Sequence, residues 1–115
     1  MLPNRVKFSK TATDKLRYMK ANTGLTPNIL ARMAIMLALK DSNSLQNAGV
    51  ADSDGQELNK SVLFGDHAHV YEVMIKQFLH DNNVDQPMQQ IITSLVEVGV
   101  HKMGHVKSLS DLCDL

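Results

Sequence analysis

The chain lacks the features that would indicate a secreted or membrane-spanning protein. Its single cysteine, Cys113, rules out a disulfide within the chain, and one thiol in 115 residues is typical of a reducing compartment. The basic N-terminal segment is not followed by an apolar stretch of signal-peptide length, and no stretch is long enough to span a bilayer. These absences predict a soluble protein that stays in the cytoplasm.

Aromatic residues are scarce as well. There is no tryptophan, and the seven methionines outnumber the three phenylalanines and two tyrosines together. A core with so few rings has to be built from Leu, Ile, Val and Met, which favours helices over sheets. The length fits one domain spanning residues 1–115, and we predict a mainly α-helical domain with a short N-terminal strand.

Carboxylates are nearly absent from residues 1–40, although the whole chain has a formal net charge of zero. Eight lysines and arginines accompany Asp14 there, whereas residues 41–115 hold four lysines and eleven carboxylates. The two parts therefore carry formal charges of +7 and −7. Such asymmetry indicates a face that binds a polyanion. The alternative is a solvated basic helix that pairs with the acidic half of the same chain.

The segment NRVKFS alternates polar and apolar residues, which predicts a short half-buried strand. Its polar side holds Arg5, Lys7 and Ser9, and its apolar side holds Val6 and Phe8. The strand therefore places two cations on one exposed face.

A first helix is predicted from about residue 13 to residue 22. Thr11 or Thr13 supplies a hydroxyl that can cap its start, and Gly24 favours the left-handed conformation that ends a helix. Helical spacing puts one apolar stripe on this segment, made of Ala12, Leu16 and Met19.

A second helix begins at Pro27, with Thr26 as its cap, and is apolar nearly all the way round. Only Arg32 and Lys40 interrupt it. Because a chain of this size cannot enclose a helix on every side, we expect partner chains to cover it through symmetric self-association. The expected interface residues are Ile29, Met33, Met36 and Leu37.

The acidic helical half, residues 60–115, is predicted to follow a polar loop at residues 41–56 that has a tight turn at Asp54–Gly55. The run SVLF fits either a strand or the entry to a helix. A third helix is predicted to end near residues 82–83, and a fourth to begin at the cap Asp85 and stop at Gly104. The expected apolar faces are Val70, Val73, Met74, Phe78 and Leu79 on the third helix, and Met88, Ile91, Ile92, Leu95, Val96 and Val98 on the fourth. A last short turn is expected to be capped by Ser108 or Ser110.

The order of strand, helix, glycine turn and capped apolar helix resembles the ribbon-helix-helix family. That resemblance implies that strands of two subunits pair into an antiparallel ribbon that enters the DNA major groove. The polar side of NRVKFS, including Ser9, would then face DNA. The segment from Gly24 to Thr26 resembles the family's phosphate-contacting helix start, although Pro27 removes one of the N–H donors that such a site uses.

The segments RVKFSKTATDKLRYMKANTGLTPNILARMAIMLAL and LNKSVLFGDHAHVYEVMIKQFL resemble the DndE family. This resemblance implies a bacterial DNA-phosphorothioation pathway, a non-catalytic DNA-binding role, a multimer and companion proteins that perform the sulfur chemistry. It brings no catalytic motif. By position, the DNA-contact role is assigned to a basic patch of Lys10, Lys15, Arg17 and Lys20, whose charges attract phosphates whatever the base sequence.

Metal and thiol chemistry have little support in the sequence. His101 and His105 are four residues apart, but Gly104 interrupts the turn that would align them, and no cysteine pair exists. These two histidines, like His67 and His69, are interpreted as surface or helix-terminal residues. Cys113 lies among carboxylates that disfavour the thiolate, so it is interpreted as a bystander.

A magnesium nuclease site built from acidic residues is also weighed. The candidates Asp66, Glu72, Asp81 and Asp85 have no recognisable spacing, and the acidic half is evenly charged, which favours a solvated face. With no phosphate loop or nucleophile elbow either, we expect a protein without catalytic residues, metal or cofactor.

These features together predict a homo-oligomer, with four copies as the expected number, that binds double-stranded DNA beside other proteins of the sulfur-modification system in the bacterial cytoplasm. The DNA-binding residues would be Arg5, Lys7 and the basic patch. The first alternative is a ribbon-helix-helix repressor or antitoxin that reads bases. The others are a scaffold that docks partner enzymes and, last, a metal-dependent nuclease.

Overall fold

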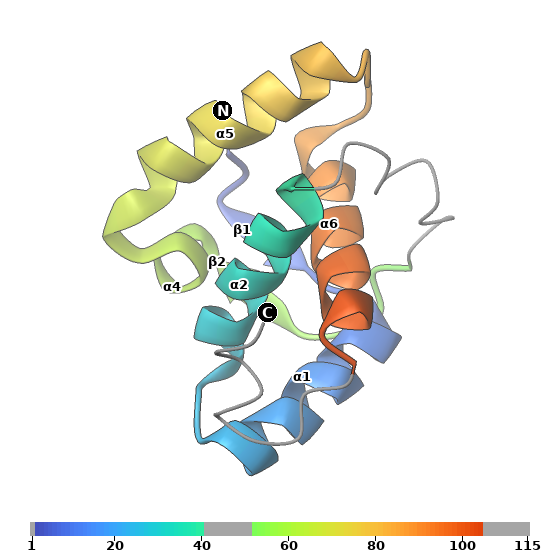
Figure 1. The fold of residues 1–115 in the computed structure, drawn as a ribbon. Coiled ribbons are helices and arrows are strands. Elements are labelled where there is room, and N and C mark those ends of the chain that lie inside the picture. The colour runs from blue at the N-terminus through green and yellow to red at the C-terminus, as the bar shows by residue number, and fades with distance from the viewer. Residues whose placement is uncertain (1, 41–51, 105–115) are drawn as a thin grey trace.

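Helices α2 and α6 pack against each other at the centre of a mainly α-helical fold (Figure 1). The computed structural model describes residues 2–40 and 52–104. Figure 1 shows α1 across one end of the α2–α6 pair and α5 across the other, with α4 beside α2. The elements are β1 (Arg5–Lys7), α1 (Lys10–Thr23), α2 (Pro27–Leu39), β2 (Glu57–Asn59), α4 (Lys60–Phe64), the 3-10 turn η1 (Gly65–His67), α5 (Ala68–Asp81) and α6 (Met88–Lys102).

Small residues let α2 and α6 approach closely. Gly99 lies against the backbone of Ala34, and a Cβ atom at position 99 would collide with the Ala34 carbonyl group. The two helices supply ten of the 21 buried apolar side chains in the described residues, namely Leu30, Ala31, Ala34, Ile35 and Ala38 from α2, and Ile91, Ile92, Leu95, Val96 and Val100 from α6. The predicted apolar face of α6 is therefore confirmed in its central residues, with Val98 half-buried.

The start of α1 differs from the prediction. The cap is Ser9 rather than Thr11 or Thr13, because the chain turns directly from the strand into the helix and the Ser9 hydroxyl accepts the Ala12 N–H at 3.0 Å. Ser9 is buried, and its hydroxyl also donates to the Glu97 carboxylate of α6. The expected position of Ser9 on the exposed side of the strand is therefore wrong.

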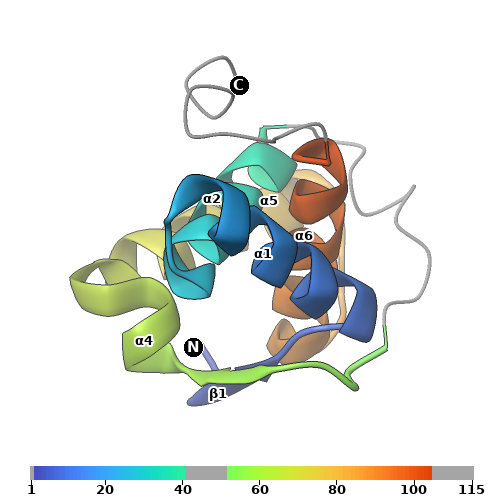
Figure 2. The same ribbon diagram turned by 90° about the horizontal axis from the view of Figure 1, so that it is seen from below.

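Helix α1 begins at Lys10, three residues before the predicted start, whereas the predicted buried residues and the predicted glycine end are confirmed. Val6 and Phe8 are fully buried, and so is the stripe of α1. Gly24 ends α1 with a φ of 79°, and its N–H donates to the Lys20 carbonyl at 2.9 Å. The strand, however, has a partner that the sequence did not reveal. Strand β2 lies beside β1 (Figure 2). The two strands pair in antiparallel register, with Val6 opposite Leu58.

Helix α5 buries a narrower face than expected. Ile75 and Phe78 are its buried residues, whereas Val70 and Val73 are 51% and 53% exposed, so their predicted core positions are wrong. The physical reason is that α5 crosses the end of the α2–α6 pair at the outside of the fold (Figure 1), so only part of its surface is covered. The run SVLF belongs to α4, which settles the choice between strand and helix in favour of helix.

The ends of the last two helices lie close to the predicted positions. Helix α5 ends at Asp81, and α6 ends at Lys102, two residues before Gly104. The cap of α6 is Pro87 rather than Asp85, because the helix begins only at Met88. Ser108 and Ser110, proposed as caps of a last turn, lie outside the described residues. None of the described helices is both long and apolar enough to cross a membrane.

Candidate nucleic-acid interface

Three cations of α1 line one groove. Lys10, Arg17 and Lys20 are exposed and share a side of the helix, since the spacings of seven and ten residues correspond to about two and three turns. The groove has a volume of about 520 Å³, and its other wall is formed by Pro27 at the start of α2 and by the backbone around Gly55. In the described part of the chain, no ion pair engages any of the three cations.

Lys15 does not belong to this groove. It is half-buried, and its Nζ lies 3.4 Å from Nδ1 of His101 on α6. Together with Tyr18, Val100 and neighbouring residues it lines a separate hollow of about 260 Å³ between α1 and α6. The predicted basic patch therefore divides into three cations along the groove and one cation directed toward α6.

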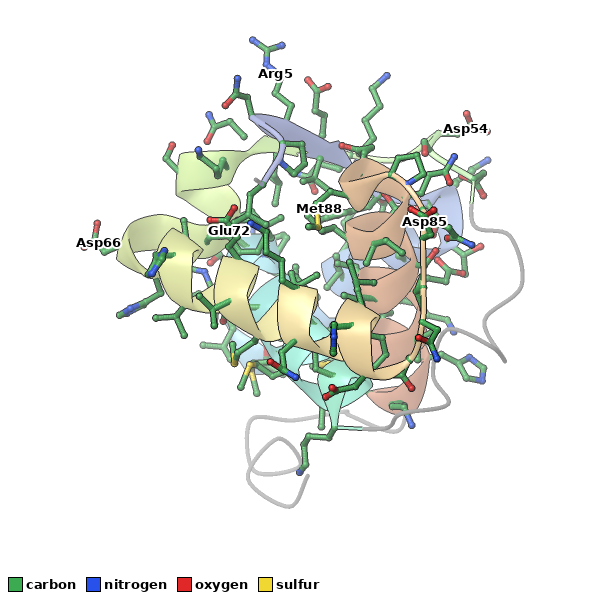
Figure 3. The ribbon with its side chains drawn as sticks, turned by 90° about the horizontal axis from the view of Figure 1, so that it is seen from above. Arg5, Asp54, Asp66, Glu72, Asp85 and Met88 are labelled. Atoms are coloured by element: carbon green, nitrogen blue, oxygen red, sulfur yellow. The ribbon has the colours of Figure 1, made fainter. Side chains whose placement is uncertain are left out.

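The ribbon of β1 and β2 has an outer face of mixed charge. Arg5 and Lys7 are exposed, as predicted, and Figure 3 shows the Arg5 side chain pointing away from the body of the molecule. Nη1 of Arg5 lies 3.5 Å from the carboxylate of Glu57 on the neighbouring strand. A carboxylate from residues 41–115 thus lies beside the basic segment, so the acidic residues are not all on a different face.

The second edge of β1 is closed by side chains of α6. The Thr93 hydroxyl donates to the Lys7 carbonyl at 2.7 Å. The Gln89 amide, oriented so that both its atoms are satisfied, donates to the Arg5 carbonyl at 2.6 Å and accepts the Lys7 N–H at 3.0 Å. Gln89 therefore occupies the place of a third strand. An intersubunit ribbon, which the ribbon-helix-helix resemblance predicts, would have to displace these contacts.

A carboxylate from the acidic half covers the start of α1. Asp52 accepts the backbone N–H groups of Lys10 and Asp54, each at 3.0 Å. These hydrogen bonds, first that from Asp54 and then that from Lys10, lower the pKa of Asp52 below its ordinary value. No pattern in the sequence predicts this contact, because the two segments are 42 residues apart.

Arg32 does not line the groove, and its guanidinium instead binds backbone carbonyl groups of α4. Its Nε donates to the Leu63 carbonyl at 2.5 Å, and Nη2 donates to the Val62 carbonyl at 3.0 Å. The guanidinium therefore satisfies carbonyl groups in the last turn of α4. A Cβ atom at Gly65 would lie 2.9 Å from Nη2 of Arg32, so the glycine also leaves space for this side chain.

The four residues predicted as an oligomer interface lie on one surface. Ile29 and Met36 are 38% and 41% exposed, and Met33 and Leu37 are half-buried. All four line a hollow of about 380 Å³, which adjoins a groove of about 750 Å³ that reaches Val73 of α5 through the shared Met36. We call this combined region the α2–α5 apolar surface. The contribution of α5 to it was not predicted.

The candidate metal ligands remain separate where they are described. No group of three or more His, Cys, Asp and Glu residues that could hold a metal ion occurs within residues 2–40 and 52–104. Figure 3 shows Asp66, Glu72 and Asp85 at different places around the molecule. His105 and Cys113 lie outside the described residues.

Fold and groove together define a small, mainly α-helical protein whose first helix places three cations along one groove. A family model described as DNA sulphur modification protein DndE matches residues 5–111, and the chain belongs to this family. A comparison with curated proteins gives no match.

Two similar solved structures support the same family. The crystal structure of DndE from Escherichia coli B7A, involved in DNA phosphorothioation modification, has a TM-score of 0.74 and 28% identity, covering 90% of this chain and 98% of that one. The structure of a DndE G21/24K mutant involved in DNA phosphorothioation has a TM-score of 0.72 and 26% identity, covering 90% of this chain and 99% of that one. The expected fold class is thereby confirmed, while the ribbon-helix-helix likeness stays a prediction.

Proposed function

We propose that this chain is a non-catalytic accessory protein of DNA phosphorothioation that binds double-stranded DNA mainly through the phosphate backbone. Membership of the DndE family places it in DNA sulphur modification. The observation that carries the DNA contact is the groove with Lys10, Arg17 and Lys20 along one side. Other proteins of the same modification system are the expected protein partners.

The groove suits phosphates better than base edges. Its cations stand on an exposed helix beside an open hollow, and flexible lysines attract phosphate oxygens without reading a donor and acceptor pattern. Arg5 and Lys7 on the ribbon extend the set of cations available to DNA. This arrangement supports affinity with little sequence preference.

Self-association is part of the proposal. The α2–α5 apolar surface exposes large apolar side chains from two helices, as an interface between copies requires. A homo-oligomer of four copies would present several grooves to one duplex. Linked weak sites bind far more tightly than single ones, because the later contacts are intramolecular.

The test compares two double charge reversals. Arg17→Glu with Lys20→Glu changes the groove, whereas Lys60→Glu with Lys76→Glu makes the same change in charge on α4 and α5. Binding to a fluorescent duplex is measured at several salt concentrations, with circular dichroism as the check on folding. We expect the groove variant to lose DNA binding and the control to keep most of it. Equal losses would show a response to net charge alone and would contradict the groove assignment.

The main alternative is a ribbon that reads bases, as a repressor would. The two-stranded ribbon exposes Arg5 and Lys7 and has a width that the major groove of DNA can admit. Competition with scrambled duplexes separates the two functions, because a base reader loses affinity on the wrong sequence. A protein that binds no DNA at all would instead favour the scaffold function.

A further inference from the structure

Carboxylates and cations are equal in number in and beside the groove of α1. Lys10, Arg17 and Lys20 provide the positive charges. Asp14 and Asp54 line the same groove, and Asp52 is bonded to the backbone of Lys10 at its end. The formal charge around one groove is therefore zero, in spite of the excess of +7 in residues 1–40.

The loop of residues 52–56 is fastened to the start of α1. The Gly55 N–H donates to the Phe8 carbonyl at 2.8 Å, and the Gln56 N–H donates to the Thr13 hydroxyl at 2.9 Å. A Cβ atom at Gly55 would collide with the Thr13 hydroxyl, so the loop backbone rests directly on the first turn of the helix. The carboxylates of this loop are thus held beside the cations by the fold.

The acid of the loop remains charged near neutral pH. The backbone N–H groups of Asp54 and Lys10 stabilise the ionised carboxylate of Asp52 and lower its pKa. A phosphate that approaches Lys10 therefore meets a fixed negative charge at the same turn. Repulsion between two anions at short distance opposes the attraction of the phosphate to the lysine.

We propose that Asp52 and Asp54 form an acidic lip that competes with DNA phosphates for the cations of α1 and so weakens the affinity of each groove for DNA. This inference rests on the proposed function. A groove weakened in this way binds DNA tightly only when several copies contact one duplex together. Free single chains would then bind DNA weakly, and DNA binding would depend on assembly.

The experiment removes the negative charges of Asp52 and Asp54 and keeps the shape of both side chains. Asn in place of Asp retains a side-chain oxygen that can accept the same N–H groups, so Asp52→Asn with Asp54→Asn leaves the loop bonded to α1. The control, Asp66→Asn with Asp85→Asn, removes the same charge at exposed positions outside the groove. Binding of a fluorescent duplex of about 20 base pairs is measured at about 50 mM salt, where phosphate contacts are strong.

We expect the lip variant to bind roughly tenfold more tightly than the wild type, and the control to change much less. Asp54→Asn alone should give part of this gain, and it breaks no side-chain hydrogen bond found in the described residues. If lip and control variants gain equally, or if neither gains, the lip is refuted while the proposed function stands on the binding of the wild type.

Two further outcomes apply if the wild-type protein does not bind the duplex. Binding by the lip variant alone would support the lip as an inhibitory contact. Failure of both proteins to bind the duplex would refute the proposed function and the lip together.

Discussion

The hydroxyl of Thr93 on α6 donates to the backbone carbonyl of Lys7 on β1, at a distance of 2.7 Å. This contact joins the ribbon, which exposes Arg5 and Lys7, to the central helix of the core. The Lys7 side chain is exposed, whereas its backbone carbonyl is hydrogen-bonded to α6. The fold therefore fixes the direction in which this cation points. Helix α6 therefore positions the ribbon as well as filling the core.

Replacing Thr93 by Val should destabilise the protein. Thr93 is buried, so the isosteric change leaves the Lys7 carbonyl without this donor and costs about 1–3 kcal/mol in the free energy of unfolding. Urea unfolding followed by circular dichroism measures the loss. The matched control is Thr11→Val on the exposed side of α1, which should change stability by less than about 0.5 kcal/mol. Equal losses in the two variants would show that the Thr93 hydrogen bond does not contribute to the free energy of unfolding.

Local pattern explains which parts of the fold were predictable. Val6 and Phe8 alternate with exposed cations, and Gly24 follows an amphipathic segment, so the strand, α1 and its end could be predicted from neighbouring residues. The cap at Ser9 was missed, because the alternation of the strand continues through this residue in the sequence. Val73 was misplaced because the outer side of α5 is also apolar, and periodicity cannot tell a core from an exposed surface.

The candidate site was predictable only in part, for a related reason. Lys10, Arg17 and Lys20 lie on one helix, so their shared side follows from helical spacing. The Asp52 contact with Lys10 and the contact between Lys15 and His101 join segments that are 42 and 86 residues apart. The residues around Asp52 and around Lys15 form no pattern that predicts these partners. Long-range pairing therefore decides which cations of the basic segment remain available.

Acidification should remove the contribution of Asp52 to stability. Its pKa is lower in the folded protein than in the unfolded chain, where aspartate side chains have a pKa of about 3.9. The stabilisation is therefore complete above that unfolded value and is lost as the pH falls through the folded one. The melting temperature of the wild type relative to Asp52→Asn should decrease between about pH 5 and pH 2. A difference that stays constant over this range would show that the carboxylate is not stabilised by these N–H groups.

Charge placed on the α2–α5 apolar surface should break the oligomer. Met36 is partly exposed in a single chain, so Met36→Asp can fold as a monomer, but an interface that covers it would bury an unpaired carboxylate at a cost of several kcal/mol. Sedimentation at micromolar concentration should show an oligomer for the wild type and a smaller species for the variant. Tyr18→Asp, at an exposed residue of α1 outside this surface, is the control and should keep the wild-type mass. A monomeric wild type would refute the interface.

Single substitutions in α1 should distinguish the groove cations from Lys15. Each phosphate contact releases condensed counterions, so loss of one contact reduces the slope of log Kd against log salt by about one. Arg17→Ala should produce that reduction and weaken binding to all duplexes alike, because Arg17 lines the groove without an ion pair among the described residues. Lys15→Ala should leave the slope nearly unchanged, since the Lys15 ammonium is directed toward His101 of α6. A reduction of the slope by Lys15→Ala equal to that by Arg17→Ala would mean that DNA contacts the side of α1 next to α6 as well, and the groove would then be only part of the interface.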